Sequence, residues 1–358
     1  FPVITWYVII GSCGYGATGS SVLTDLLREY DDIQVYDNFE FVIAYRVDGL
    51  QDLEYHLMKQ YAKNSTGDYA IKRFLYAAKC YMTPAINKPC SGKKFYEISE
   101  NFINNILQVS YKGVDTADML SGNIMKNILA FASKKVFMPK VIEKVTKKTS
   151  YIWPCRTMYY SVEPENFYEE AKKYINNILE AMGVDLSRPV CLDQPFEGNA
   201  PQQSFPFFDD PYAVVIDRDP RDLYLAGKYT KDPNFKFTPK KNVDDFIIYY
   251  KNLRKNQKND NQRILRVNFE DLIYCYEDSI KKIEEFLNLG EHIREKQIFD
   301  PEKSINNTQL IRLHPEDKNE INKIEKELKE FLYPFEDYKN IEFKGKPFDG
   351  AARKAFSQ

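Results

Sequence analysis

Histidine is scarce in this chain, which has three among its 358 residues. His56, His292 and His314 fall in segments that we predict as helices or loops, away from the strand ends where α/β proteins gather their ligands. We therefore expect all three to be surface or packing residues. A general base is then to be sought among the carboxylates.

Cysteine pairs and a strong net charge are also lacking. The six cysteines form no Cys-x-x-Cys pair and no zinc or disulfide spacing, so we expect no metal and a reducing, cytoplasmic location. The apolar stretch 3–10 is too short to span a membrane, so we expect no transmembrane segment. The 50 basic residues balance 52 acidic ones, and without a broad basic field we expect no nucleic-acid partner.

The most informative feature is a glycine-rich stretch between a buried strand and a helix. The loop reads Gly14-Tyr15-Gly16-Ala17-Thr18-Gly19-Ser20-Ser21. Glycines adopt backbone angles that other residues avoid, and a helix start offers unpaired N–H groups and the positive end of the helix dipole. The loop therefore predicts a cradle for a phosphate or sulfate, although a tight turn without a ligand is the structural alternative.

One position departs from the phosphate-loop spacing of nucleotide triphosphatases. Gly14 and Gly19 are separated as that motif requires, but Ser20 stands where its lysine belongs, just before the hydroxyl residue Ser21. The cradle is therefore expected without the positive charge that such enzymes direct at the outer phosphates.

A second apolar strand, 212–216, runs into Asp217-Arg-Asp-Pro-Arg-Asp222 and then a helix. Arg218 and Arg221 can bind a phosphate through forked, charge-assisted hydrogen bonds at the end of that strand. The alternative is that both arginines pair with the neighbouring aspartates in a structural network.

Three segments in this order resemble the PAPS-dependent sulfotransferases, in particular the bacterial or glycan-modifying branch. They are the glycine loop, the strand that ends in Arg218-Asp-Pro-Arg-Asp222, and Val267-Asn-Phe-Glu-Asp-Leu272 before an amphipathic helix. The resemblance covers about a quarter of the chain, and residues 45–185 match no pattern that we can name. It implies a P-loop-type fold and a transferase that moves a sulfuryl group from PAPS to a hydroxyl group without a metal.

Two positions depart from the family's pattern. The family carries Lys or Arg two residues before the last glycine of the loop, and this chain has Ala17. The family also has a serine eight residues after the strand-end arginine, and this chain has Ala226. The resemblance thus implies that Arg218 holds the 3′-phosphate of the donor, while the cation at the leaving group is missing from the loop.

The candidate bases are carboxylates at strand ends. Glu40 follows the predicted second strand, 33–36, in a short aromatic-rich segment where the resemblance places a catalytic glutamate. Asp37 lies three residues earlier and is its rival; the structural alternative is that Asp37 caps the next turn and Glu40 is solvated. Asp193, followed by Gln194, ends another buried strand and can hold the acceptor hydroxyl or a backbone amide.

Strands and helices alternate along the chain, which predicts a parallel sheet. We expect an α/β fold in three layers, a P-loop-type sheet flanked by helices, with a large helical insertion at about residues 50–150. A single domain then covers 1–340, and 341–358 form a loose tail.

Three function classes remain open. The first is a sulfotransferase that acts on a carbohydrate or a small hydroxylated acceptor. The second is a P-loop kinase or nucleotidase that uses magnesium with ATP or GTP, because Asp217 ends an apolar strand as a magnesium-organising aspartate does and Ser21 can bind the metal. The third is a non-catalytic nucleotide-binding member of the fold, suggested by Ala17 and Ala226 together.

Overall fold

The computed structural model describes residues 7–60, 64–84, 86–113, 156–230, 238–258, 261–290 and 292–338, with a few isolated positions elsewhere. The chain divides into two compact units. The first, here called the sheet unit, comprises Phe1–Tyr45 and Leu179–Gln358; the second, the helical unit, comprises Arg46–Ile178.

The sheet unit contains five parallel strands in the order β2-β5-β1-β6-β7. The strands are β1 Ile9–Gly14, β2 Gln34–Glu40, β5 Val190–Asp193, β6 Pro211–Asp217 and β7 Ile264–Asn268. The central strands β1 and β6 are buried along nearly their whole length, as expected for parallel strands that are covered on both faces. The predicted α/β fold with a parallel sheet is confirmed.

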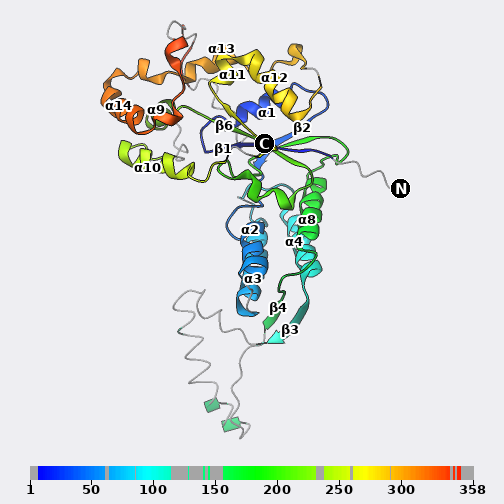
Figure 1. Ribbon diagram of the computed structural model, residues 1–358. Coiled ribbons are helices and arrows are strands. Elements are labelled where there is room, and N and C mark those ends of the chain that lie inside the picture. The colour runs from blue at the N-terminus through cyan, green and yellow to red at the C-terminus, as the bar shows by residue number, and fades with distance from the viewer. Residues whose placement is uncertain are drawn as a thin grey trace. The chain divides into compact units, whose positions relative to one another are not determined.

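Helices α1 Ser21–Leu27, α11 Asp271–Tyr274 and α12 Tyr276–Leu287 cover one face of this sheet (Figure 1). Their contact with the sheet is a continuous apolar core that includes Leu23 and Leu26 of α1 and Val214 of β6. Fully burying one such side chain contributes about 1.5–3 kcal/mol, so this face stabilises the strand–loop–helix unit that begins the chain.

The opposite face is covered in part by the segment after β5. Phe196 packs so closely on Gly11 that a Cβ atom there would lie 2.4 Å from its ring, which explains the glycine inside β1. Beside it, helices α9 Pro220–Tyr229, α10 Val243–Leu253 and α14 Lys318–Glu327 share a second apolar cluster. Two free thiols, Cys13 on β1 and Cys191 on β5, are completely buried in the sheet.

The helical unit contains α2 Leu50–Glu54, a π-helical turn η1 Tyr55–Lys59, α3 Asn64–Cys80 and α4 Gly92–Ile106. It also holds most of α8 Phe167–Ala181 and an antiparallel pair of strands, β3 Val109–Gly113 and β4 Arg156–Tyr160. Aromatic rings fill its centre, where Phe102 and Tyr174 stack with centroids 5.0 Å apart. The unit extends beyond the range of about 50–150 that we predicted for the insertion.

One strand prediction was wrong at its end. Strand β2 continues to Glu40 instead of stopping at 36, because its pairing with β5 resumes after an irregularity between Tyr36 and Glu40. Asp37 and Glu40 therefore lie within the strand and not after it. Most of the predicted tail, 341–358, falls outside the described residues.

Candidate functional site

The glycine loop connects β1 to α1 and is tightly curved. Gly16, Ala17 and Gly19 have left-handed backbone angles, with φ values of 78°, 59° and 95°. At Gly19 an added Cβ would also lie 2.8 Å from the ring of Phe269, so both conformation and space require glycine there. The glycine pattern seen in the sequence thus has a structural reason at this position.

Hydrogen bonds from Ser12 and Tyr15 hold the loop, and several of its backbone N–H groups are not used in them. The Ser12 hydroxyl donates to the Ser20 carbonyl at 2.8 Å, and the Tyr15 N–H donates to Thr18 Oγ1 at 3.2 Å. Among the described residues, no group accepts a hydrogen bond from the backbone N–H groups of 16–20. Backbone N–H groups without a partner in such a loop are available to bind an oxyanion.

Carboxylates line the neighbouring strand ends. Asp193 is the register partner of Ser12 on one side and of Glu40 on the other. Burial, together with the nearby charges of Glu40 and Asp37, raises the pKa of Asp193 to about 7, against the opposing effect of Arg28. A carboxyl group that titrates near neutral pH is suited to accept a proton there.

The other two candidate bases are placed differently. Asp37 forms an ion pair with Arg28 and accepts a hydrogen bond from the Thr24 hydroxyl at 3.0 Å. Both of its carboxylate oxygens therefore already have partners, in α1 and at the C-terminal end of that helix. Glu40 is exposed at the end of β2. The structure therefore places all three predicted carboxylates on the neighbouring strands β2 and β5, where Asp37 and Asp193 are half-buried and Glu40 is exposed.

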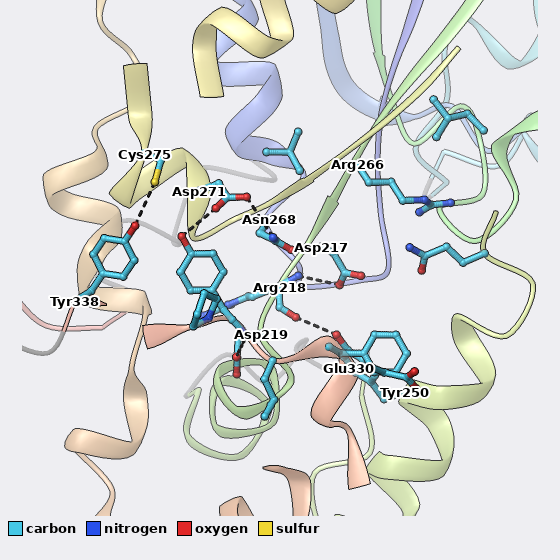
Figure 2. A pocket seen from close by; sticks show the side chains of 17 residues that line it. Asp217, Arg218, Asp219, Tyr250, Arg266, Asn268, Asp271, Cys275, Glu330 and Tyr338 are labelled. Carbon is cyan, nitrogen blue, oxygen red and sulfur yellow. Dashed lines mark hydrogen bonds between the residues drawn. The ribbon is translucent and has the colours of Figure 1, made fainter. Parts of the chain in front are cut away.

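A hollow of about 750 Å³ opens at the carboxyl ends of β6 and β7 (Figure 2). Its wall includes Arg218, Arg266 and Asn268. Arg218 is 7% exposed and touches the loop, because its guanidinium donates to the Ala17 carbonyl at 3.3 Å and to the Asn307 carbonyl at 2.5 Å. Its buried Nε has no partner among the described groups.

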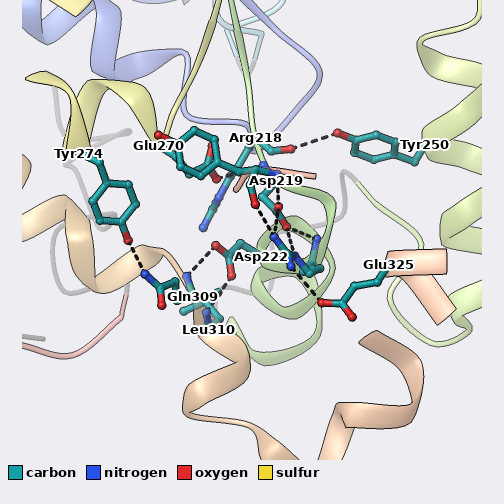
Figure 3. A network of polar contacts seen from close by, with 11 residues as sticks. Arg218, Asp219, Asp222, Tyr250, Glu270, Tyr274, Gln309, Leu310 and Glu325 are labelled. Carbon is teal, nitrogen blue, oxygen red and sulfur yellow. Dashed lines mark hydrogen bonds and ion pairs between the residues drawn. The ribbon is translucent and has the colours of Figure 1, made fainter. Parts of the chain in front are cut away.

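Arg221 lies in a different environment from Arg218, because its partners are Asp219 and Glu325 of the polar network in Figure 3. Its guanidinium pairs with Asp219 at 2.7 Å and with Glu325 at 3.0 Å, and it donates to the Tyr333 carbonyl at 2.8 Å. This arrangement corresponds to the structural network that was the alternative for the arginine pair. An anion-binding role for Arg221 stays a prediction.

Asp217, the candidate magnesium ligand of the kinase alternative, is occupied by an arginine. Arg254 donates to both of its carboxylate oxygens, at 2.9 and 2.5 Å, and is itself stacked between Tyr15 and Tyr250. Within the described part of the chain, no group of three or more His, Cys, Asp or Glu side chains is arranged to hold a metal ion.

Two arginines near the loop were missed by sequence reasoning. Arg266 of β7 donates to the Tyr15 hydroxyl at 2.8 Å and to the Gly198 carbonyl at 3.0 Å. A charged residue inside an apolar strand was the available signal for Arg266. Arg254 had no such signal, because it ends a helix among other polar residues.

The three histidines make contacts that do not involve the loop or Asp193. In the sheet unit, His292 pairs with Glu29 and His314 stacks on Tyr229. In the helical unit, His56 contacts Gln60. In the described residues no helix has both the length and the apolar character to cross a bilayer.

No protein-family model and no curated protein matches the chain. Among solved structures, the sulfotransferase domain of the Synechococcus PCC 7002 olefin synthase is 12% identical, over 81% of this chain and 79% of that one, with a TM-score of 0.35. A sulfotransferase from Mycobacterium avium is 12% identical, over 96% and 79%, with a TM-score of 0.34. Retinol dehydratase, solved with androsterone and the inactive cofactor PAP, is 14% identical, over 96% and 84%, with a TM-score of 0.32.

Proposed function

We propose that the sheet unit binds PAPS and transfers its sulfuryl group to a hydroxyl of a carbohydrate or small-molecule acceptor. The observation that carries this proposal is the position of Asp193. It is a carboxyl group with a pKa of about 7, one strand away from the strand that leads into the anion loop. Sulfuryl transfer needs little more than in-line positioning, neutralised oxygens and a base, and these are the groups that meet here.

In this mechanism the backbone N–H groups of 16–20 hold the sulfated end of the donor. Asp193 accepts the proton of the acceptor hydroxyl, while the oxygen of that hydroxyl forms a bond to sulfur. The bond between sulfur and the bridging phosphate oxygen breaks, and the loop N–H groups stabilise the charge that this oxygen gains. Burial, together with the charge of Glu40 beside it, keeps the pKa of Asp193 high enough for it to act near neutral pH.

The hollow beside Arg218 is the proposed place for the 3′-phosphoadenosine half of the donor. Arg218 lines this hollow and also donates a hydrogen bond to the Ala17 carbonyl of the loop. Its guanidinium carbon lies 5.1 Å from the centroid of the Phe269 ring. Its unpartnered buried Nε supports an acceptor group close by. Ala226 cannot supply the second phosphate contact that the sulfotransferase pattern expects.

A binding titration tests the proposal. The full chain is titrated by calorimetry with PAPS, PAP, ATP and GTP, each with and without magnesium, and sulfated products are then sought by mass spectrometry with a panel of sugars and phenols. We expect PAPS and PAP to bind more tightly than ATP, without magnesium, and at least one acceptor to gain a sulfuryl group. Magnesium-dependent ATP binding without PAP binding would support a kinase, and PAP binding without turnover would support a non-catalytic protein.

A further inference from the structure

Gln194 has an unusual backbone conformation directly after Asp193. Its φ of 50° is left-handed, and it precedes Pro195, a position where residues are normally extended. Two hydrogen bonds fix it: its N–H donates to the Ser12 carbonyl at 2.9 Å, and its carbonyl accepts from the Tyr45 hydroxyl at 3.2 Å. A strained residue held this firmly at a strand end indicates a constraint on where its side chain points.

The side chain of Gln194 bridges the two ends of the anion loop. Its Oε1 accepts from the Gly14 N–H at 3.2 Å, and its Nε2 donates to Ser20 Oγ at 2.9 Å. A backbone N–H can only donate, so the amide oxygen must face Gly14 and the amide nitrogen must face Ser20. The Ser20 oxygen is therefore an acceptor in this contact.

This assignment decides where the hydroxyl hydrogen of Ser20 goes. The hydrogen cannot point at Nε2, which already donates, and no other described residue accepts it. It is left for an acceptor from outside the chain, at the point in the loop where the phosphate-loop spacing expects a lysine.

We propose that Gln194 is a positioning residue that turns the Ser20 hydroxyl hydrogen toward the oxyanion in the loop. The inference rests on the proposed function, because it concerns the same loop. Two neutral groups then replace the cation that is absent at Ser20. The groups assigned to the ligand, the loop N–H groups and the Ser20 hydroxyl, are donors in this arrangement. They therefore favour oxygens that carry no hydrogen, as in a sulfate ester or a fully ionised phosphate, over a protonated acid oxygen.

A double-mutant cycle tests the coupling between the two side chains. Gln194→Met removes both the amide oxygen and the amide nitrogen of the side chain while nearly keeping its length. Ser20→Ala removes the hydroxyl. Affinities for PAP and for pyrophosphate are measured by calorimetry on the full chain. We expect each single change to weaken binding about tenfold, and the double variant to bind no more weakly than Ser20→Ala, because Gln194 acts through Ser20.

Two conservative variants separate positioning from a merely structural role. Ser20→Thr keeps a hydroxyl that Gln194 can orient, so it should retain most of the affinity. Gln194→Glu offers only acceptors and would turn the hydroxyl hydrogen away from the ligand. Gln194→Glu should therefore reduce the affinity for PAP and pyrophosphate much more when Ser20 is present than in the Ser20→Ala variant. In that variant only the repulsion between the glutamate and the anionic ligand remains.

Independent effects that multiply in the double variant would overturn the inference. So would a Gln194→Met variant that binds both probes as the parent does. If pyrophosphate or ATP binds and PAP does not, the proposed function fails while the cycle, run with the ligand that binds, still decides the role of Gln194. Thermal melts of every variant show whether folding is intact, and Tyr45→Phe serves as the variant that changes the Gln194 backbone contact alone.

Discussion

The ionisation of Asp193 is set by its burial and by charged groups on β2 and at the end of α1. Desolvation and the charges of Glu40 and Asp37 all oppose its negative form, and Arg28 only partly offsets them. Near neutral pH, Asp193 is therefore present in both its ionised and its protonated form. A general base needs this balance, because it must take up a proton and release it again in each turnover.

We expect Asp193→Asn to reduce turnover by about a hundredfold or more while leaving the affinity for PAP within a fewfold of the parent. The loss follows because an amide cannot take the acceptor proton. Initial rates on an acceptor found in the panel, together with calorimetry, measure both effects. Turnover at the parental rate would place the base elsewhere, and Glu40→Gln and Asp37→Asn would then be compared.

The pH dependence of turnover gives a second test at this residue. The rate should rise with pH through an apparent pKa near 7, because Asp193 must be ionised to act as a base. Glu40→Gln removes one of the charges that raise this pKa, so the rising limb should move to lower pH. A limb that stays in place after this change would separate Glu40 from the titrating group.

Stability should change with pH for the same reason. The pKa of Asp193 is raised in the folded state, so folding becomes less favourable as pH rises from about 4 to 7, where the unfolded chain has already released this proton. Asp193→Asn should be more stable than the parent by on the order of 1–2 kcal/mol above pH 7, allowing for partial solvent contact. Urea titrations at several pH values should show this difference widen up to pH 7 and then level off.

At the scale of elements, the loop depends on one close approach. A Cβ atom at Gly14 would lie 2.6 Å from Thr18 Oγ1, the atom that accepts the Tyr15 N–H. Gly14→Ala should therefore distort the loop and weaken PAP binding by tenfold or more, with little change in the far-ultraviolet circular dichroism. Gly19→Val is a poorer probe, since it would also push against the buried ring of Phe269.

Arg218 and Arg221 lie three residues apart at the junction between β6 and α9, so substitutions at the two positions can be compared directly. A charge-assisted hydrogen bond contributes about 1.5–3 kcal/mol, so Arg218→Ala should weaken PAP binding roughly ten- to a hundredfold and affect a nucleotide without the 3′-phosphate much less. Arg221→Ala breaks its pair with Asp219 and should lower the melting temperature. A change in the nucleotide preference of Arg221→Ala would support the predicted anion-binding role of Arg221, and an unchanged preference would support its role in the structural network. Equal losses for both nucleotides in Arg218→Ala would make Arg218 a structural residue.

The sequence predicted those elements whose signal is local. Strands β6 and β7 are short, mainly apolar runs that end at polar residues, and they lie within one position of the predicted ranges 212–217 and 264–268. The first strand was predicted at 5–10 and lies at Ile9–Gly14, so it runs further into the glycine-rich stretch than expected. Strand β3 was not predicted, because it is only five residues long and its first four residues are exposed, so no buried apolar run marks it. The contact between Arg254 and Asp217 joins residues 37 apart, and nothing near either position indicates it.

At the scale of the whole molecule, ligand binding and folding are linked. A ligand that binds only the folded chain stabilises it by about 2.7 kcal/mol at a hundred times its dissociation constant. PAP at that excess should raise the melting temperature of the full chain by several degrees, with or without magnesium. A shift that requires magnesium would favour the kinase alternative, and the inactive-loop variant Gly14→Ala provides the control.

The buried thiols of Cys13 and Cys191 can be used to measure how often the sheet opens locally. Burial raises the pKa of both thiols, so neither is a reactive thiolate while the sheet is closed. Cys13 is the residue before Gly14, in the strand that carries the loop. The rate at which an alkylating reagent modifies Cys13 therefore reports how often the first strand and its loop separate from the sheet, and a ligand seated in the loop should slow that reaction in proportion to its occupancy.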